Sequence, residues 1–111
     1  MSDCLFCRIA EREIPSKTIY EDERVVAFED IAPQAPTHFL VVPRAHHADL
    51  DAASKDPELL GELVARAAAI ARDRGLKDYR LVVNTGSEAG QTVFHLHLHV
   101  LGGRRMTWPP G

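Results

Sequence analysis

Three histidines alternate with apolar residues toward the carboxyl end of the chain. The stretch at residues 90–101 reads GQTVFHLHLHVL and contains His95, His97 and His99. Alternation with a period of two is typical of a β-strand with one buried face, which would place the imidazoles about 6.8 Å apart on the other face. A neutral imidazole is a nucleophile, a base or a metal ligand near neutral pH. We therefore predict a reactive site here, in preference to a polar sheet face that happens to be rich in histidine.

This stretch resembles the signature of the histidine triad (HIT) superfamily. The resemblance extends over nearly the whole chain. Its Hint branch, the purine nucleoside phosphoramidases, is similar in the segments FEDI, PQAPTH, VN, GQT and WPPG, which are residues 28–31, 33–38, 83–84, 90–92 and 108–111. The resemblance implies a nucleotide-binding hydrolase that cleaves the P–N bond of purine nucleoside 5′-phosphoramidates, such as adenosine phosphoramidate or AMP-lysine. The products would be a nucleoside monophosphate and an amine.

The resemblance assigns the nucleophile to the middle histidine, His97. An imidazole attacks phosphorus through an unprotonated nitrogen, so its other nitrogen must carry a proton and donate it, most often to a backbone carbonyl. Attack would form a covalent nucleotidyl-histidine, which water then cleaves. His99 would hold or protonate phosphate oxygens as charge develops on them, and His95 completes the catalytic set. Neither a P-loop nor a carboxylate cluster for Mg²⁺ is visible in the sequence, so catalysis need not involve a metal.

The loop before the histidines suits a bound phosphate. Gly90 permits a close approach of the backbone, and neighbouring N–H groups could point toward an anion. Thr92 offers a hydroxyl near the leaving group, where the Hint branch often has serine. Asn84 could bond phosphate or ribose, although its residue type alone indicates a turn at the end of a strand. Gln91 and Val93 belong to the same stretch, and we include both among the substrate-binding residues.

Apolar residues that could enclose a nucleobase occur in two short segments. They are Phe6, Ile9, Phe28 and Ile31. Nucleotide sites are mostly apolar with a few placed polar groups, but core packing would explain the same four residues. Asp30 could accept hydrogen bonds from ribose hydroxyls. Its residue type alone indicates an exposed loop, and only the resemblance of residues 28–31 implies that it binds.

Cys4 and Cys7 form a C-x-x-C pair, which can supply half of a tetrahedral zinc site. The resemblance to zinc-bearing HIT proteins implies that His46 and His95 supply the other half, with His47 as a rival to His46. Such a site would be structural, because four protein ligands leave no position open for substrate. Two reduced thiols on a helix can also pack without any metal.

The length of 111 residues predicts one small domain that spans residues 1–111. The chain is 45% hydrophobic and its net charge is −3. This charge argues against binding to nucleic acid, whereas a single nucleotide needs only a local site. The sequence shows neither a signal-peptide core nor an apolar run that could span a membrane. We therefore expect a cytoplasmic protein without a membrane partner, in which the cysteines stay reduced.

An α+β fold with a mainly antiparallel sheet must position these residues. Five strands are expected, over residues 16–22, 25–29, 38–43, 79–84 and 93–101. A short helix is expected over residues 4–12, and a long one from Asp56-Pro57 to Gly75. We interpret residues 30–37 and 85–91 as loops, and His38 as a structural residue. The HIT resemblance implies the same five-stranded sheet, paired across a homodimer.

Trp108 lies in a tail beyond Gly102-Gly103, where it has no obvious place in its own core. An exposed tryptophan is costly, and tryptophan is enriched where one chain buries against another. A small core and an alanine-rich helix also favour a dimer. Resemblance to the Hint branch places this tail near the nucleotide site of the neighbouring subunit, so Trp108 joins the substrate-binding residues.

Two other functions remain open at this point. The first is a dinucleoside polyphosphate hydrolase of the Fhit-like branch, against which the WPPG ending argues. The second is a non-catalytic nucleotide sensor or scaffold, against which the complete set of three histidines argues.

Overall fold

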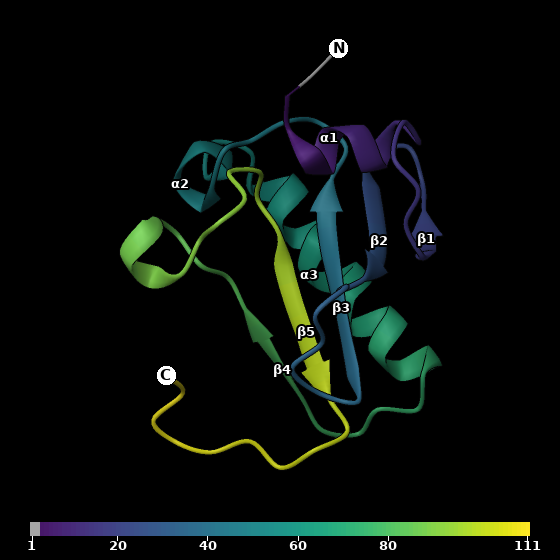
Figure 1. Ribbon diagram of the computed structural model, residues 1–111, viewed down its shortest axis with the longest axis vertical. Coiled ribbons are helices and arrows are strands. Elements are labelled where there is room, and N and C mark those ends of the chain that lie inside the picture. Colours follow the sequence, from purple (N-terminus) through teal and green to yellow (C-terminus); the bar gives the residue numbers. More distant parts are fainter. Residues whose placement is uncertain (1–2) are drawn as a thin grey trace.

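A single antiparallel sheet forms the centre of the computed structural model, which describes residues 3–111. Its strand order is β1-β2-β3-β5-β4 (Figure 1). The strands are β1 (Thr18–Glu21), β2 (Val25–Glu29), β3 (Thr37–Pro43), β4 (Tyr79–Val82) and β5 (Leu98–Gly102). The helices are α1 (Leu5–Ala10), α2 (Leu50–Ala53) and α3 (Pro57–Asp73). The expected α+β fold with five antiparallel strands is therefore confirmed.

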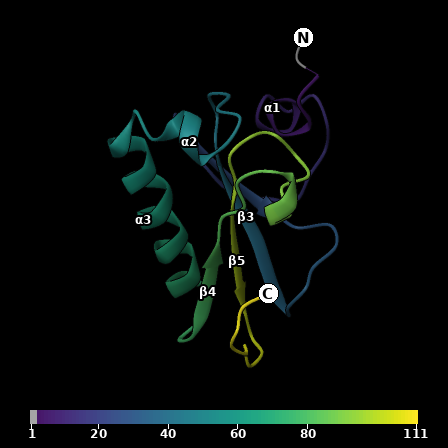
Figure 2. The ribbon, with the colours of Figure 1, turned by 90° about the vertical axis from the view of Figure 1, so that its left-hand side faces the viewer.

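Helix α3 covers one face of the sheet (Figure 2). It begins as the sequence predicts, because the Asp56 carboxylate accepts a hydrogen bond from the Leu59 N–H at 3.1 Å and Pro57 occupies the first turn. It ends before Gly75, whose φ of 78° is unfavourable for other residues. The residues that it buries recur at helical spacing and pack on the sheet: Leu59, Leu63, Ala67, Ile70 and Ala71.

Helix α1 lies over the opposite face, at one end of the sheet (Figure 2). It buries Phe6 and Ala10 against strand residues that alternate with those facing α3. These strand residues are Val26, Phe28, Leu40 and Val42. The sheet therefore has an apolar layer on both faces, and the short helix covers only part of the second one.

Strand β5 begins at Leu98, not at residue 93 as the alternation predicts. Its neighbour β3 ends at Pro43, and the ladder between the two strands extends only to the pair Val41 and Leu98. Beyond that point the Leu96 N–H donates to the His47 carbonyl at 2.7 Å. The alternation of faces nevertheless persists, because Leu96 and Leu98 both join the core under α3.

Other boundaries differ more modestly. Strand β4 ends at Val82, and the short helix α2 was not predicted; Asp49 caps it by accepting from the Ala52 N–H at 2.8 Å. A single 3-10 turn, Ser87–Ala89, lies within the predicted loop. Among residues 3–111, no helix is both long and apolar enough to cross a membrane.

Candidate active site and metal centre

The three histidines lie on the α1 side of the sheet but differ in their surroundings. His95 is fully buried and His97 is nearly so, whereas the side chain of His99 is 20% exposed. The Phe6 ring contacts both His95 and His97, with ring centroids 6.0 and 5.0 Å away. The rings of His97 and His99 are 5.0 Å apart. The predicted grouping of the three imidazoles on one face is thus observed, although only His99 lies within β5.

The His97 ring is held in one orientation by the backbone of His95. Nδ1 donates to the His95 carbonyl oxygen at 2.7 Å, which leaves Nε2 as the unprotonated nitrogen of a neutral ring. Burial lowers the pKa of His97, against the opposing effects of that carbonyl and of Asp30. Among the described residues no hydrogen bond engages Nε2, and His97 is 7% exposed. His97 is therefore a mostly buried neutral ring whose Nε2 lone pair is not taken by the protein.

His99 forms a hydrogen bond with a fourth histidine, His38. Its Nδ1 lies 2.9 Å from Nε2 of His38, and an Asp30 oxygen lies 3.4 Å from the same His38 nitrogen. Burial, followed by His97 and His38, lowers the pKa of His99 to about 4, while Asp30 opposes this shift. From the sequence we interpret His38 as a structural residue, and the structure adds its contact with His99. Its position in the PQAPTH segment was a signal of something more, but the pairing with His99 joins residues 61 positions apart.

The loop before the histidines is organised by Gln91. This side chain is buried; its amide donates to the carbonyls of Ala48 and Val93 at 2.8 and 3.2 Å, and its oxygen accepts from the Gly86 N–H at 2.9 Å. All of its polar atoms are therefore committed to the protein, and the Gln91 side chain shapes the loop. Its place among the substrate-binding residues stays a prediction.

The rest of this loop is open. Gly90 has φ of 100°, and a Cβ added there would lie 3.8 Å from the Asn84 side-chain amide. Glycine thus satisfies the backbone conformation and keeps the space beside Asn84 free. Thr92 is exposed, and Val93 packs against the apolar cluster of α1.

The predicted nucleobase residues separate into two groups. Phe6 and Phe28 are buried and meet edge to face at 5.3 Å, with Ile9 partly buried beside them. Ile31 is 99% exposed and does not belong to the apolar cluster that contains the other three. Asp30 and Ile31 instead line a neighbouring groove of about 760 Å³, which His38 also borders.

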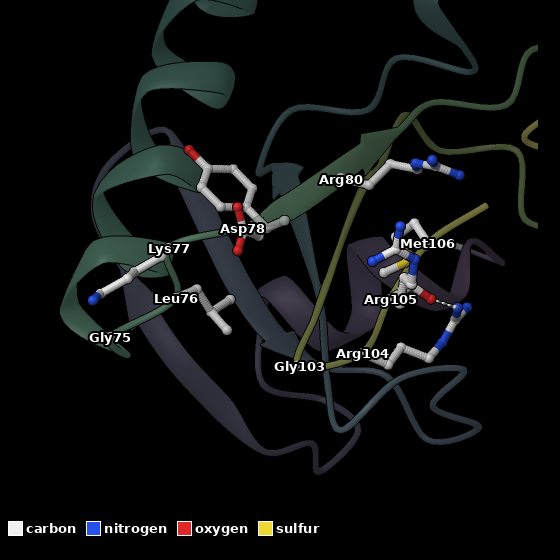
Figure 3. A pocket seen from close by; sticks show the side chains of 10 residues that line it. Gly75, Leu76, Lys77, Asp78, Arg80, Gly103, Arg104, Arg105 and Met106 are labelled. Carbon is white, nitrogen blue, oxygen red and sulfur yellow. Dashed lines mark hydrogen bonds between the residues drawn. The ribbon is translucent and has the colours of Figure 1, made fainter. Parts of the chain in front are cut away.

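A second groove of about 760 Å³ lies between the residues before β4 and the tail, and it includes none of the three histidines. Figure 3 shows Arg80 of β4 on the same side of this groove as Arg104 and Arg105 of the tail, with Lys77 set apart from them. Arg80 donates to the Thr107 carbonyl at 3.0 Å, which ties the tail to β4. Trp108 remains 81% exposed, in agreement with the expectation that it has no place in its own core.

Comparisons with known proteins identify the family. A family model described as the HIT domain matches residues 11–106. The chain belongs to the HIT family. It is 51% identical to a HIT-like protein of Synechocystis sp. over 98% of this chain and 97% of the relative. It is 46% identical to the 14 kDa zinc-binding protein of Zea mays, over 99% of this chain and 89% of that protein.

A solved structure confirms the fold of this HIT domain. The HIT family hydrolase from Legionella pneumophila Philadelphia 1 superposes with a TM-score of 0.95 at 51% identity. The alignment covers 98% of this chain and all of that one. The arrangement of sheet, helices and tail described above is therefore the HIT fold.

The HIT domain brings Cys4, Cys7, His46 and His95 together, with one ligand atom from each within 4.8 Å of the others. His95 Nδ1 lies 3.3 and 3.4 Å from the two sulfurs, and His46 Nδ1 lies 3.4 Å from Cys7 Sγ. A tetrahedral zinc site has S···N separations of roughly 3.5 Å. These residues therefore fit zinc in both chemistry and spacing. His47 is not part of the cluster.

The buried ligand is also oriented for a metal. His95 Nε2 donates to the Pro43 carbonyl at 2.7 Å, which leaves Nδ1 unprotonated and directed at the cysteines. Burial, above all other effects, lowers the pKa of His95 to about 4. The ring is therefore neutral at pH 7, as a ligand must be.

Proposed function

We propose that this HIT protein is a nucleotide hydrolase that cleaves the P–N bond of purine nucleoside 5′-phosphoramidates through a covalent intermediate on His97. The observation that carries the proposal is the bond from His97 Nδ1 to the His95 carbonyl, at 2.7 Å. This bond fixes a neutral tautomer whose other nitrogen, Nε2, keeps the lone pair that would attack a substrate.

The reaction has two displacements at phosphorus. In the first, His97 Nε2 forms a bond to phosphorus, the P–N bond to the amine breaks, and the amine leaves with a proton relayed from water by the exposed Thr92 hydroxyl. In the second, water attacks phosphorus and passes one proton through the Thr92 hydroxyl back to solvent, the bond to Nε2 breaks, and the nucleoside monophosphate leaves. His99 donates to phosphate oxygens in both steps. Asn84 and the backbone around Gly90 lie beside the loop that would hold the phosphate.

The nucleoside would lie against the apolar cluster of α1. Phe6 is shared between that cluster and the His97 ring, so a base placed near Phe6 and Ile9 brings its 5′-phosphorus toward His97. Asp30 lies close to both His38 and His99, and it would accept from ribose hydroxyls through the oxygen that does not bind the Ala32 N–H. Purine preference is part of this proposal because the Hint resemblance favours it.

We further propose that Cys4, Cys7, His46 and His95 hold one zinc ion as a structural site. The donor set and the S···N distances support this assignment. When bound, zinc would tie the amino-terminal helix to the segment that carries the nucleophile. The ion would have no open coordination position, so none of the reaction steps passes through it.

The active unit is proposed to be a homodimer. Strand β4 stands at an edge of the sheet, and Val64, Tyr79 and Trp108 expose apolar surface in the single chain. A second copy that covers this surface would give the exposed tryptophan a partner, and the tail of one subunit would then border the nucleotide site of the other.

One preparation of the protein tests the reaction. Adenosine phosphoramidate, AMP-lysine and a diadenosine polyphosphate are each supplied, and brief exposure to substrate is followed by acid-free digestion and mass mapping. Turnover of the phosphoramidates with an adenylyl group on the His97 peptide is expected. Preference for the diadenosine compound would support the Fhit-like alternative, and nucleotide binding without turnover or adduct would support a sensor or scaffold.

A further inference from the structure

The two cysteines take no part in the proposed reaction, and their sulfurs meet at the start of α1. Cys4 caps this helix and Cys7 stands in its first turn, where the Cys7 N–H donates to the Cys4 sulfur at 3.5 Å. The two sulfurs lie within 4.8 Å of each other, at 3.3 and 3.4 Å from His95 Nδ1. Both side chains therefore converge on one point.

The spacing of the pair also permits a covalent bond between the sulfurs. Residues three positions apart at a helix start have Cα atoms about 5 Å apart. This separation lies within the range of about 4.4–6.8 Å that a disulfide spans. Cys4 and Cys7 are present as thiols in this structure. Closure of the bond therefore requires rotation of the two side chains and no large movement of the backbone.

Small molecules can reach the pair from one side. Cys4 and Cys7 are both partly exposed, and His46, which lies 3.4 Å from the Cys7 sulfur, is exposed. His95 is fully buried on the other side of the cluster. The cluster thus has a closed side at His95 and a side open to solvent at His46.

We propose that Cys4 and Cys7 form a reversible oxidation site, at which hydrogen peroxide converts the two thiols into a disulfide and the structural metal is released. The disulfide rests only on the placement of the two sulfurs, whereas the metal loss rests on the zinc site proposed above. Where thiols are normally kept reduced, a pair of this kind is oxidised only transiently, which is typical of redox sensing.

The oxidation is a two-electron reaction in two steps. The thiolate of one cysteine attacks a peroxide oxygen, the O–O bond breaks, and the departing hydroxide takes a proton to become water, which leaves a sulfenic acid. The second thiolate attacks that sulfur, the S–O bond breaks, and a second hydroxide takes a proton. Two thiolates, one peroxide and two protons thus give one disulfide and two waters. A dithiol reductant reverses the change by thiol–disulfide exchange.

The metal is lost because a disulfide sulfur is no longer a thiolate, which is the form that binds zinc. His46 and His95 would remain as two neutral ligands in place of a set of four. Helix α1 would then be held chiefly by the packing of Phe6 and Ala10, and by the bond from Arg44 to the Ala10 carbonyl at 2.7 Å. Oxidation therefore removes the covalent link between this helix and the segment that carries His95.

Mass mapping after peroxide treatment reads the disulfide directly. Trypsin cleavage after Arg8 places both cysteines in one peptide, residues 1–8. A disulfide within the chain lowers the mass of this peptide by two hydrogens, a bond between two copies joins two such peptides, and oxidation of Met1 adds an oxygen. We expect the first product, together with release of close to one zinc per chain to a chromogenic chelator, and recovery of both thiols with a dithiol. Two thiols that still alkylate after treatment, or peptides joined between copies, would overturn the proposal.

Two variants separate the disulfide from the metal. Cys7→His keeps a zinc ligand but cannot form the disulfide, so it should retain its zinc under the same peroxide treatment. His46→Ala should bind no zinc and should still form the disulfide. Equal zinc release from Cys7→His and the wild type would show that the metal is lost without the disulfide, against the proposal. If the wild type contains no zinc, the zinc site fails, and the disulfide in the wild type and in His46→Ala decides the oxidation site.

The consequence for substrate rests on the proposed function and is measured on the same preparations. Phe6 and Ile9 of α1 are the proposed walls for the base, so oxidation should raise KM for adenosine phosphoramidate by about threefold or more, with a smaller change in kcat. A dithiol should restore KM, and Cys7→His should show no change with peroxide. An unchanged KM in the oxidised wild type would contradict coupling between the thiols and the nucleotide site. If the untreated wild type is inactive, the proposed function fails, while the peptide mass and the zinc release still test the oxidation site.

Discussion

The carbonyl oxygen of His95 lies 2.7 Å from Nδ1 of His97. The ring of the same His95 is held at both ends, by the Pro43 carbonyl at 2.7 Å and by the Cys4 sulfur at 3.3 Å. One residue therefore contributes its side chain to the cysteine cluster and its backbone to the orientation of the His97 ring. The two rings also share a contact with Phe6, so the surroundings of His95 and His97 are coupled by both a hydrogen bond and packing.

Replacement of His97 by alanine should abolish turnover of adenosine phosphoramidate. The covalent bond that we propose for His97 can no longer form, so kcat should fall by about 10⁴ or more. AMP binding should remain measurable by calorimetry, since Phe6, Ile9 and Asp30 are unchanged. Turnover near the wild-type value would show that the bond to phosphorus forms elsewhere.

Protein purified without added metal should contain close to one zinc per chain by elemental analysis. His46→Ala should lose the metal, whereas His47→Ala should retain it, because His46 and not His47 belongs to the cluster. Removal of zinc should lower the free energy of unfolding by about 2.7 kcal/mol when the free zinc had been 100 times its Kd. A metal-free preparation with full stability would indicate that the two cysteines only pack and bind no metal.

Asp56→Ala should destabilise the fold without altering catalysis. It removes the cap on the Leu59 N–H, which is worth about 1 kcal/mol, and a partly exposed ion pair with Arg24 at 3.0 Å, which adds about 1 kcal/mol at most. Asp56→Ser keeps the cap and loses only the ion pair. Its free energy of unfolding, measured with urea, should therefore be closer to that of the wild type than that of Asp56→Ala. Equal losses in the two variants would assign the effect to the ion pair.

Truncation after Arg105 should alter selectivity among leaving groups more than it alters the fold. The deleted residues include the exposed Trp108 and the Thr107 carbonyl that binds Arg80. Rates with a panel of phosphoramidates that differ only in the amine provide the measurement, and light scattering at micromolar concentration gives the oligomeric state. A monomeric wild type, or an unchanged substrate profile after truncation, would contradict a role for the tail at the partner's site.

Local patterns in the sequence determined much of this protein by themselves. The alternation around His97 indicated which side chains face α3 and which face the site, because neighbouring residues on an extended chain point to opposite faces. The Asp56-Pro57 start of α3 was equally local, since a cap is formed by residues three positions apart. The C-x-x-C pair likewise predicted half of a metal site from its spacing alone.

Only the tertiary structure decided which distant groups meet. Strand β5 starts at Leu98 because its ladder with β3 ends at the pair Val41 and Leu98, and the Leu96 N–H donates instead to the His47 carbonyl; a strand needs a bonded neighbour as well as a pattern. The same kind of contact brings His38 to His99 and commits Gln91 to the Ala48 carbonyl. Hydrogen bonds between segments far apart in the sequence depend on how the sheet and its loops pack, and periodicity and residue type carry no information about that packing.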